Sequence, residues 1–243
     1  MDFFEVGTAL LGFSTRQDGD LGFYKMHDRS AIQKWASLCQ AQSWHFSFPR
    51  FVKQVHGTKV FFLEGPSSAG LQGEADAIST NEDESPVGVF SADCLPVIVV
   101  GRQAIAAIHA GWKSSLGNIT GITIEQFCSR WEEGICDLSV FLGPCIGPCC
   151  LEMGDEIPIA FSDIASGYLG AFSHGKKWHL DLRALNVMQA LESGVSLANI
   201  RHVNDCTKCR VDKYFSFRNS PQRDGSMFSF VVRSSKLSSQ GGV

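Results

Sequence analysis

The centre of this chain reads GVFSADCLPVIVVGRQAIAAIHAGW, over residues 88–112. This run predicts two apolar strands, at residues 87–100 and 104–110. Each strand carries a residue that a plain core strand avoids. Cys94 lies inside the first strand, and His109 lies at the end of the second, directly before a Gly-Trp pair. We therefore expect the segment to build both a sheet and part of a functional site.

An earlier segment, residues 53–57, has a similar form, because an apolar approach leads to a histidine and then a glycine. His56, Cys94 and His109 together offer two imidazoles and one thiolate. Three such ligands are typical of a catalytic zinc site, in which the fourth position stays open for water or substrate. No two of them lie within one turn along the chain, so the site requires a fold that brings three strand ends together.

The composition is that of a soluble globular protein with a sizeable core. The chain has 243 residues, of which 44% are hydrophobic and 19% charged, and its formal net charge is −4. That charge argues against nucleic-acid binding. No apolar run approaches the ~18 residues of a membrane span, and no basic segment precedes an apolar one at the start. We therefore expect no membrane partner and a cytoplasmic protein.

Nine cysteines are many for such a protein, and in the cytoplasm they are expected to stay reduced. Cys206 and Cys209 form a C-x-x-C pair, which is a common half of a structural zinc site. The other group, Cys145, Cys149 and Cys150, does not repeat the two-residue spacing. The sequence therefore gives little reason to expect a second metal site.

The remaining elements predict a single α/β domain over residues 1–233, with mixed sheets and a polar tail at 234–243 that we expect to be disordered. No G-x-G-x-x-G follows a strand, which argues against a dinucleotide cofactor. Helices are expected from about residue 29 to 40, after a glycine-rich loop at 111–121, and from Asp181, as N-cap, to residue 193. Further strands are expected at residues 60–63, 138–142, 178–180, 200–203, 214–217 and 227–232. Ile32, Trp35 and Leu38 should face the core from the first helix.

The sequence resembles the YfiH/laccase-domain proteins, also called the multicopper polyphenol oxidase family. The resemblance covers nearly the whole chain in order, and its specific segments are Gln54-Val55-His56-Gly57, Ala92-Asp93-Cys94-Leu95-Pro96-Val97 and Ala107-Ile108-His109-Ala110-Gly111-Trp112. The match continues through Gly143-Pro144-Cys145-Ile146-Gly147-Pro148-Cys149-Cys150, Asp181-Leu182, Cys206-Thr207 and Phe215-Ser216-Phe217-Arg218. Two places depart from the family. Tyr24-Lys25-Met26-His27-Asp28 replaces a loop that carries Asn, and Asp224-Gly225-Ser226 replaces Thr-Gly-Arg.

The resemblance implies a layered α/β/β/α fold with mixed sheets and a zinc site formed by His56, Cys94 and His109. It also implies purine nucleoside chemistry, namely phosphorolysis of adenosine, inosine and methylthioadenosine and deamination of adenosine. The expected partners are therefore purine nucleosides and phosphate.

Both reactions need further side chains around that site. Zinc lowers the pKa of bound water to about 7, which suits deamination, and Asp93 and Asp76 are the candidate proton carriers. On a regular strand Asp93 would face away from its neighbour Cys94, so a bulge is needed. Phosphorolysis needs an anion site, for which Arg16 and Lys113 are the candidates. Gln54, in the matched QVHG segment, is a further candidate for substrate binding.

Three other functions stay open at this point. A cysteine hydrolase or amidase acting on cell-wall precursors would use Cys94 as nucleophile and His109 as base, without any need for zinc. A copper phenol oxidase is disfavoured, because seven histidines supply few clusters and no Met lies near the Cys/His set in sequence. A non-enzymatic metal-binding module would hold metal without turnover.

Overall fold

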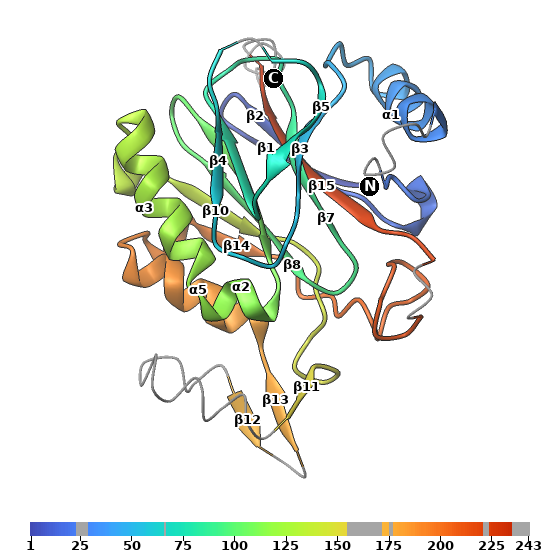
Figure 1. Ribbon diagram of the computed structural model, residues 1–243, viewed down its shortest axis with the longest axis vertical. Coiled ribbons are helices and arrows are strands. Elements are labelled where there is room, and N and C mark those ends of the chain that lie inside the picture. The colour runs from blue at the N-terminus through green and yellow to red at the C-terminus, as the bar shows by residue number, and fades with distance from the viewer. Residues whose placement is uncertain (23–28, 66, 155–171, 175–176, 221–223, 235–243) are drawn as a thin grey trace.

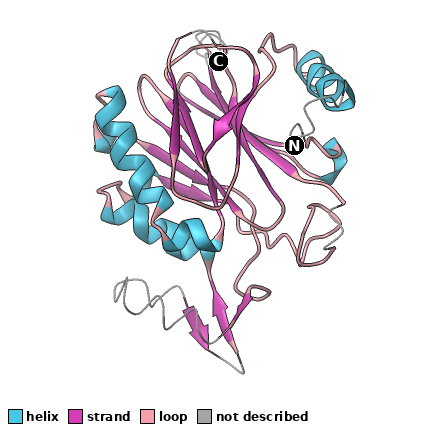
Figure 2. Ribbon diagram, in the orientation of Figure 1, coloured by secondary structure: helices cyan, strands magenta, loops and turns pink. Residues whose placement is uncertain are grey.

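The strands of this chain lie at its centre and the helices lie outside them (Figure 2). The structure is a computed structural model that describes residues 1–22, 29–65, 67–154, 172–174, 177–220 and 224–234. Within these ranges the strands form two six-stranded sheets and one three-stranded sheet. None of the described helices is long and apolar enough to cross a membrane.

The first sheet has the strand order β1-β2-β15-β7-β3-β5. The first three pairs in this order, from β1 to β7, are antiparallel, whereas β3 runs parallel to both β7 and β5. The bounds are β1 Asp2–Val6, β2 Ala9–Phe13, β15 Met227–Arg233, β7 Val87–Ser91, β3 Arg50–Lys53 and β5 Gly70–Glu74.

The second sheet has the order β14-β10-β8-β9-β6-β4 and is also mixed. Its edge strands β14 and β4 run parallel to their neighbours, and the inner pairs are antiparallel. The bounds are β14 Ile200–His202, β10 Ser139–Leu142, β8 Leu95–Val100, β9 Ile105–Ala110, β6 Ala77–Thr80 and β4 Val60–Leu63. Its strands β8 and β9 are buried along their whole length.

The two sheets pack face to face, and helices cover their outer faces (Figure 1). Along β8 the side chains alternate: Val97 packs under the helices, whereas Ile98 packs between the sheets. On the outside of the second sheet lie α2 (Trp112–Leu116), α3 (Ile119–Trp131) and α5 (Leu182–Glu192), and α1 (Arg29–Ala41) covers the first sheet. This arrangement is the α/β/β/α layering that we expected.

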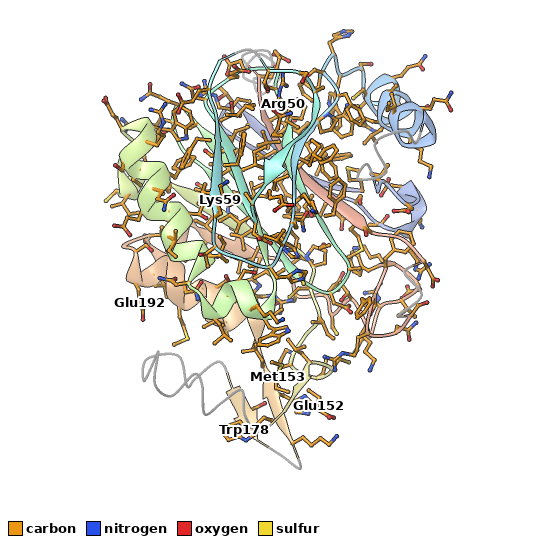
Figure 3. The ribbon with its side chains drawn as sticks, viewed as in Figure 1. Arg50, Lys59, Glu152, Met153, Trp178 and Glu192 are labelled. Atoms are coloured by element: carbon orange, nitrogen blue, oxygen red, sulfur yellow. The ribbon has the colours of Figure 1, made fainter. Side chains whose placement is uncertain are left out.

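A small third sheet extends from one end of the molecule, where Figure 3 labels Glu152, Met153 and Trp178. Its antiparallel order is β11 (Glu152–Met153), β13 (Trp178–Leu180) and β12 (Phe172–His174). Short 3₁₀ helices lie at Arg16–Asp18, Ile135–Asp137 and Leu197–Asn199.

The most important correction concerns residues 87–100, which are not one strand. The chain leaves the first sheet at the end of β7 and enters the second sheet at Leu95, the start of β8. Between them Asp93 adopts a φ of 95°, a backbone conformation that L-residues rarely take. The apolar residues on both sides of Asp93 therefore concealed a crossing between sheets, and Cys94 lies at that crossing.

Smaller differences have local causes. Part of the expected loop at 111–121 is the helix α2, and residues 214–217 form irregular backbone that leads into a turn rather than a strand. Ile32 is 49% exposed, so its expected core position is wrong, whereas Trp35 and Leu38 pack toward the first sheet as expected, together with Cys39. Asp181 is confirmed as an N-cap, because its carboxylate accepts from the backbone of Arg183 and Ala184.

The end of the described chain is held in place. Ser234, the first residue of the expected tail, is buried, and its backbone N–H donates to the Thr8 carbonyl at 2.8 Å. This hydrogen bond joins Ser234 to the turn between β1 and β2. Residues 235–243 lie outside the described residues.

Candidate metal centre and active site

His56 lies in the loop that follows β3, in a left-handed conformation with φ of 60°. The loop takes this shape around one buried carboxylate. The backbone N–H groups of Val55, His56 and Gly57 donate to Asp76 at 3.2, 2.9 and 2.7 Å. A fixed loop holds the His56 ring on the side where β9 ends, so Asp76 determines where this imidazole lies.

His109 is the penultimate residue of β9 and is 3% exposed. Its Nδ1 lies 2.9 Å from Asp76 Oδ1. Burial opposes ionisation of Asp76, but hydrogen bonds from His109, Gly57 and His56 hold the pKa of that carboxyl below its usual range. Because an ionised carboxylate can only accept, His109 Nδ1 carries a proton, and Nε2 is the ring nitrogen that could bind a metal ion.

The Cys94 thiol lies beside both of these rings. Burial would raise the pKa of its thiol, but the His109 and His56 imidazoles lower that pKa to about 6. In turn, burial would lower the pKa of His109, but the Cys94 thiolate and Asp76 raise it to about 9. A Cβ on Gly111 would lie 3.0 Å from Cys94 Sγ and 3.1 Å from His56 Cδ2, so a glycine is needed beside the pair.

The structure therefore brings His56, Cys94 and His109 together as the sequence predicts. Their ligand atoms all lie within 4.8 Å of one another. The two imidazole centroids are 4.9 Å apart, and the rings stand at 84° to each other. Such a group of two nitrogens and one sulfur could hold a single metal ion and leave one coordination position open.

The cluster opens into a cavity of about 880 Å³. That volume lies in the range that holds small organic ligands. Large apolar side chains line the cavity, among them Trp112, Phe215 and Phe217, and the cations Lys113 and Arg218 also line it. The cavity can therefore take a planar apolar ring together with an anionic group beside the three candidate ligands.

The two acidic candidates make different contacts. Asp76 is fully buried, and its oxygens are taken up by three backbone N–H groups and by His109. Asp93 lines the cavity, and its oxygens accept from Thr207 Oγ1 at 2.6 Å and from the backbone of Arg218 at 2.7 Å. This geometry favours a positioning role for Asp76 over the proton transfer that we expected of it.

The three candidates for substrate binding also differ. Lys113 lines the cavity. The Gln54 amide exchanges two hydrogen bonds with the Phe90 backbone, at 2.7 and 2.8 Å, so its polar atoms are already used although it lines the cavity. Among the described residues, Arg16 is not one of those that line the cavity. Its guanidinium lies 4.5 Å from the centre of the Phe215 ring, and its Nε donates to the Tyr214 carbonyl.

Arg218 and Thr207 take part in the site, although the sequence analysis assigned a role to neither residue. Arg218 lines the cavity and also fixes Asp93 through its backbone, while Thr207 holds the other oxygen of the same carboxylate. Arg218 does end the matched segment Phe215-Ser216-Phe217-Arg218, which was the available signal. Thr207 belongs to the matched pair Cys206-Thr207, which gave a signal of the same kind.

Fold and site together define a mixed α/β protein with a candidate His/Cys/His metal centre at the junction of two sheets. The chain belongs to the family described as multi-copper polyphenol oxidoreductase laccase, whose model matches residues 9–234. Among solved structures, YfiH of Bacillus licheniformis is 21% identical with a TM-score of 0.85, over 93% of both chains. YlmD of Geobacillus stearothermophilus is 25% identical with a TM-score of 0.81, over 93% of this chain and 92% of that one.

Curated relatives are closer in sequence. A purine nucleoside phosphorylase of Clostridium acetobutylicum is 35% identical over 186 residues, which is 75% of this chain and 76% of the relative. The adenosine deaminase RL5, from an unknown prokaryotic organism, is 32% identical over 194 residues, covering 74% of this chain and 73% of its own length.

Proposed function

We propose that this protein is a zinc-dependent purine nucleoside enzyme, which phosphorolyses adenosine, inosine and methylthioadenosine and deaminates adenosine. The observation that carries the proposal is the His56–Cys94–His109 cluster at the wall of a cavity large enough for a nucleoside. The names of the two relatives support the substrate class, since one is a purine nucleoside phosphorylase and the other an adenosine deaminase.

The donor chemistry favours zinc over copper. A thiolate and two imidazoles suit Zn²⁺, and the low pKa of Cys94 means that its sulfur is already a thiolate at neutral pH. Because the pKa of His109 is raised to about 9, zinc would displace a proton from this imidazole when it binds. Asp76 fixes the tautomer of His109 as metal-binding histidines require. A zinc ion here would supply Lewis acidity beside the substrate.

The remaining residues are assigned from their contacts. Asp76 positions both histidines, whereas Asp93 lines the cavity and is the candidate for moving a proton. Trp112 and Phe215 would hold the purine by stacking. Lys113 and Arg218 are the candidates for phosphate, because both line the cavity. Arg16 would act behind them, through Phe215.

The test compares zinc content and both purine activities in Cys94→Ser, His56→Ala and His109→Ala. Serine is a poor zinc ligand because its oxygen stays protonated, so each variant removes one of three ligands. We expect zinc affinity at this site to fall in all three, and phosphorolysis and deamination to fall together by at least about 10²-fold. Adenosine incubated with and without phosphate identifies the products.

His45→Ala is the matched control, since His45 is exposed and belongs to neither cysteine cluster. It should keep wild-type zinc and activity. If Cys94→Ser holds as much zinc as the wild type while activity is lost, and His56→Ala is milder than His109→Ala, Cys94 is the nucleophile of a cysteine hydrolase instead. Zinc binding without turnover of any nucleoside would point to a metal-binding module.

A further inference from the structure

Four cysteines far apart in sequence meet at a second place. Cys149 and Cys150 lie in the turn before β11, and Cys206 and Cys209 lie in the turns after β14. Their four sulfur atoms all lie within 4.8 Å of one another, although Cys149 and Cys209 are 60 residues apart. All four are free thiols, and Cys149 and Cys209 are exposed. Sequence spacing gave little reason to expect this cluster.

The spacing of the sulfurs suits one tetrahedral ion. Zn–S bonds of about 2.3 Å place the sulfurs of a tetrahedral site ~3.8 Å apart. Cys209 Sγ lies 3.5 Å from Cys150 Sγ and 3.6 Å from Cys149 Sγ. An iron–sulfur cluster needs more room between its cysteines than a single ion does, because several irons and sulfides lie among them.

The backbone around Cys206 is arranged for a thiolate. Gly147 N–H donates to Cys206 Sγ at 3.2 Å. A backbone N–H aimed at this sulfur favours the thiolate, which is the form of cysteine that binds a metal ion.

We propose that Cys149, Cys150, Cys206 and Cys209 bind one zinc ion in a structural site that shares no ligand with the His56–Cys94–His109 cluster. Four protein ligands close the coordination sphere, which is the pattern of structural rather than catalytic zinc. Soft thiolates in tetrahedral geometry also disfavour magnesium, calcium and manganese.

The ion would fasten the two turns that support the cavity. Thr207, between two of the ligands, donates to Asp93, and the backbone N–H of Ile146 donates to the Asp93 carbonyl at 2.9 Å. Asp93 is the strained residue that places Cys94. Cys145 is no ligand: it is fully buried, burial raises the pKa of its thiol to about 12, and its backbone pairs with Cys206.

The test measures metal per chain in the full-length protein, using Cys94→Ser as the background because it vacates the other cluster. Cys94→Ser should retain about one zinc, and Cys94→Ser with Cys209→Ser should retain none. Cys136→Ser is the matched control, since Cys136 is exposed and lies in neither cluster. In the same background it should leave the zinc in place.

A second measurement on the wild-type protein avoids variants that fail to fold. In zinc-loaded protein these four thiols should resist a thiol reagent, and they should react after a chelator removes the ion. Equal zinc in Cys94→Ser with and without Cys209→Ser, iron in place of zinc, free reaction of the four thiols in zinc-loaded protein, or a disulfide among them would each overturn the proposal.

Discussion

At the residue scale, one carboxylate organises two candidate ligands. Asp76 is fully buried yet accepts three backbone hydrogen bonds from the His56 loop and one from the His109 ring. Burial of an ionised group is tolerated only with such partners. The carboxylate therefore couples the position of one imidazole to the tautomer of the other.

Replacing Asp76 tests this coupling. Asp76→Asn keeps the shape of the side chain but replaces one acceptor oxygen with an NH₂ group, which cannot accept from the backbone N–H groups around it. The free energy of unfolding should therefore fall by about 3–5 kcal/mol. Zinc affinity should fall about 10–100-fold, measured by chelator competition on folded protein. The exposed Asp212→Asn is the control. Wild-type stability and affinity in Asp76→Asn would contradict the role.

The Cys94 thiol provides a pH prediction. Because its pKa is lowered to about 6, alkylation of metal-free protein should reach half its maximal rate near pH 6 and stay high above it. Cys145, whose pKa is about 12, is the internal control and should stay unreactive. Peptide mass spectrometry after timed alkylation measures both. A midpoint near pH 9 for Cys94 would contradict the thiolate.

The shifted pKa values of Cys94 and His109 have opposing effects on how stability depends on pH. The lowered pKa of Cys94 contributes stability that is present above its unfolded value of about 9 and lost as pH falls through 6. The raised pKa of His109 contributes stability that is present below about 6.5 and lost as pH rises through 9. Between pH 6.5 and 9 the two slopes nearly cancel, so this pair leaves the stability of the metal-free protein almost flat.

At the scale of elements, the β8–β9 hairpin has His109 at its open end, and its turn contacts a second buried carboxylate. Glu133, after α3, accepts from the backbone of Arg102, Gln103 and Ala104 at 2.9, 2.5 and 3.0 Å. These bonds tie the hairpin turn to α3. The turn thus stabilises the strands that position His109 without touching the site.

Glu133→Gln should separate stability from metal binding. The amide offers one acceptor oxygen to three donors, so the free energy of unfolding should fall by about 2 kcal/mol, with wild-type zinc content. The exposed neighbour variant Glu132→Gln is the control and should unfold like the wild type. Denaturant unfolding and metal analysis check both, and a loss of zinc in folded Glu133→Gln would contradict the separation.

At the scale of the whole molecule, the sequence predicts the layered α/β class and brings out His56, Cys94 and His109. It could not show that residues 87–100 change sheets, because both halves are equally apolar and no glycine or proline marks Asp93. It also could not show that Cys149 and Cys206 meet, since turns that are distant along the chain leave no periodic signal. Local patterns predict elements, whereas these sites depend on how elements are joined.

The crossing at Asp93 has a consequence for cooperativity. His56 follows a strand of the first sheet, His109 ends a strand of the second, and Cys94 lies where the chain passes between them. A partly unfolded species that keeps only one sheet retains an incomplete ligand set. An ion held by all three residues would therefore favour the fully assembled state over every such intermediate, and the two layers would unfold as one unit.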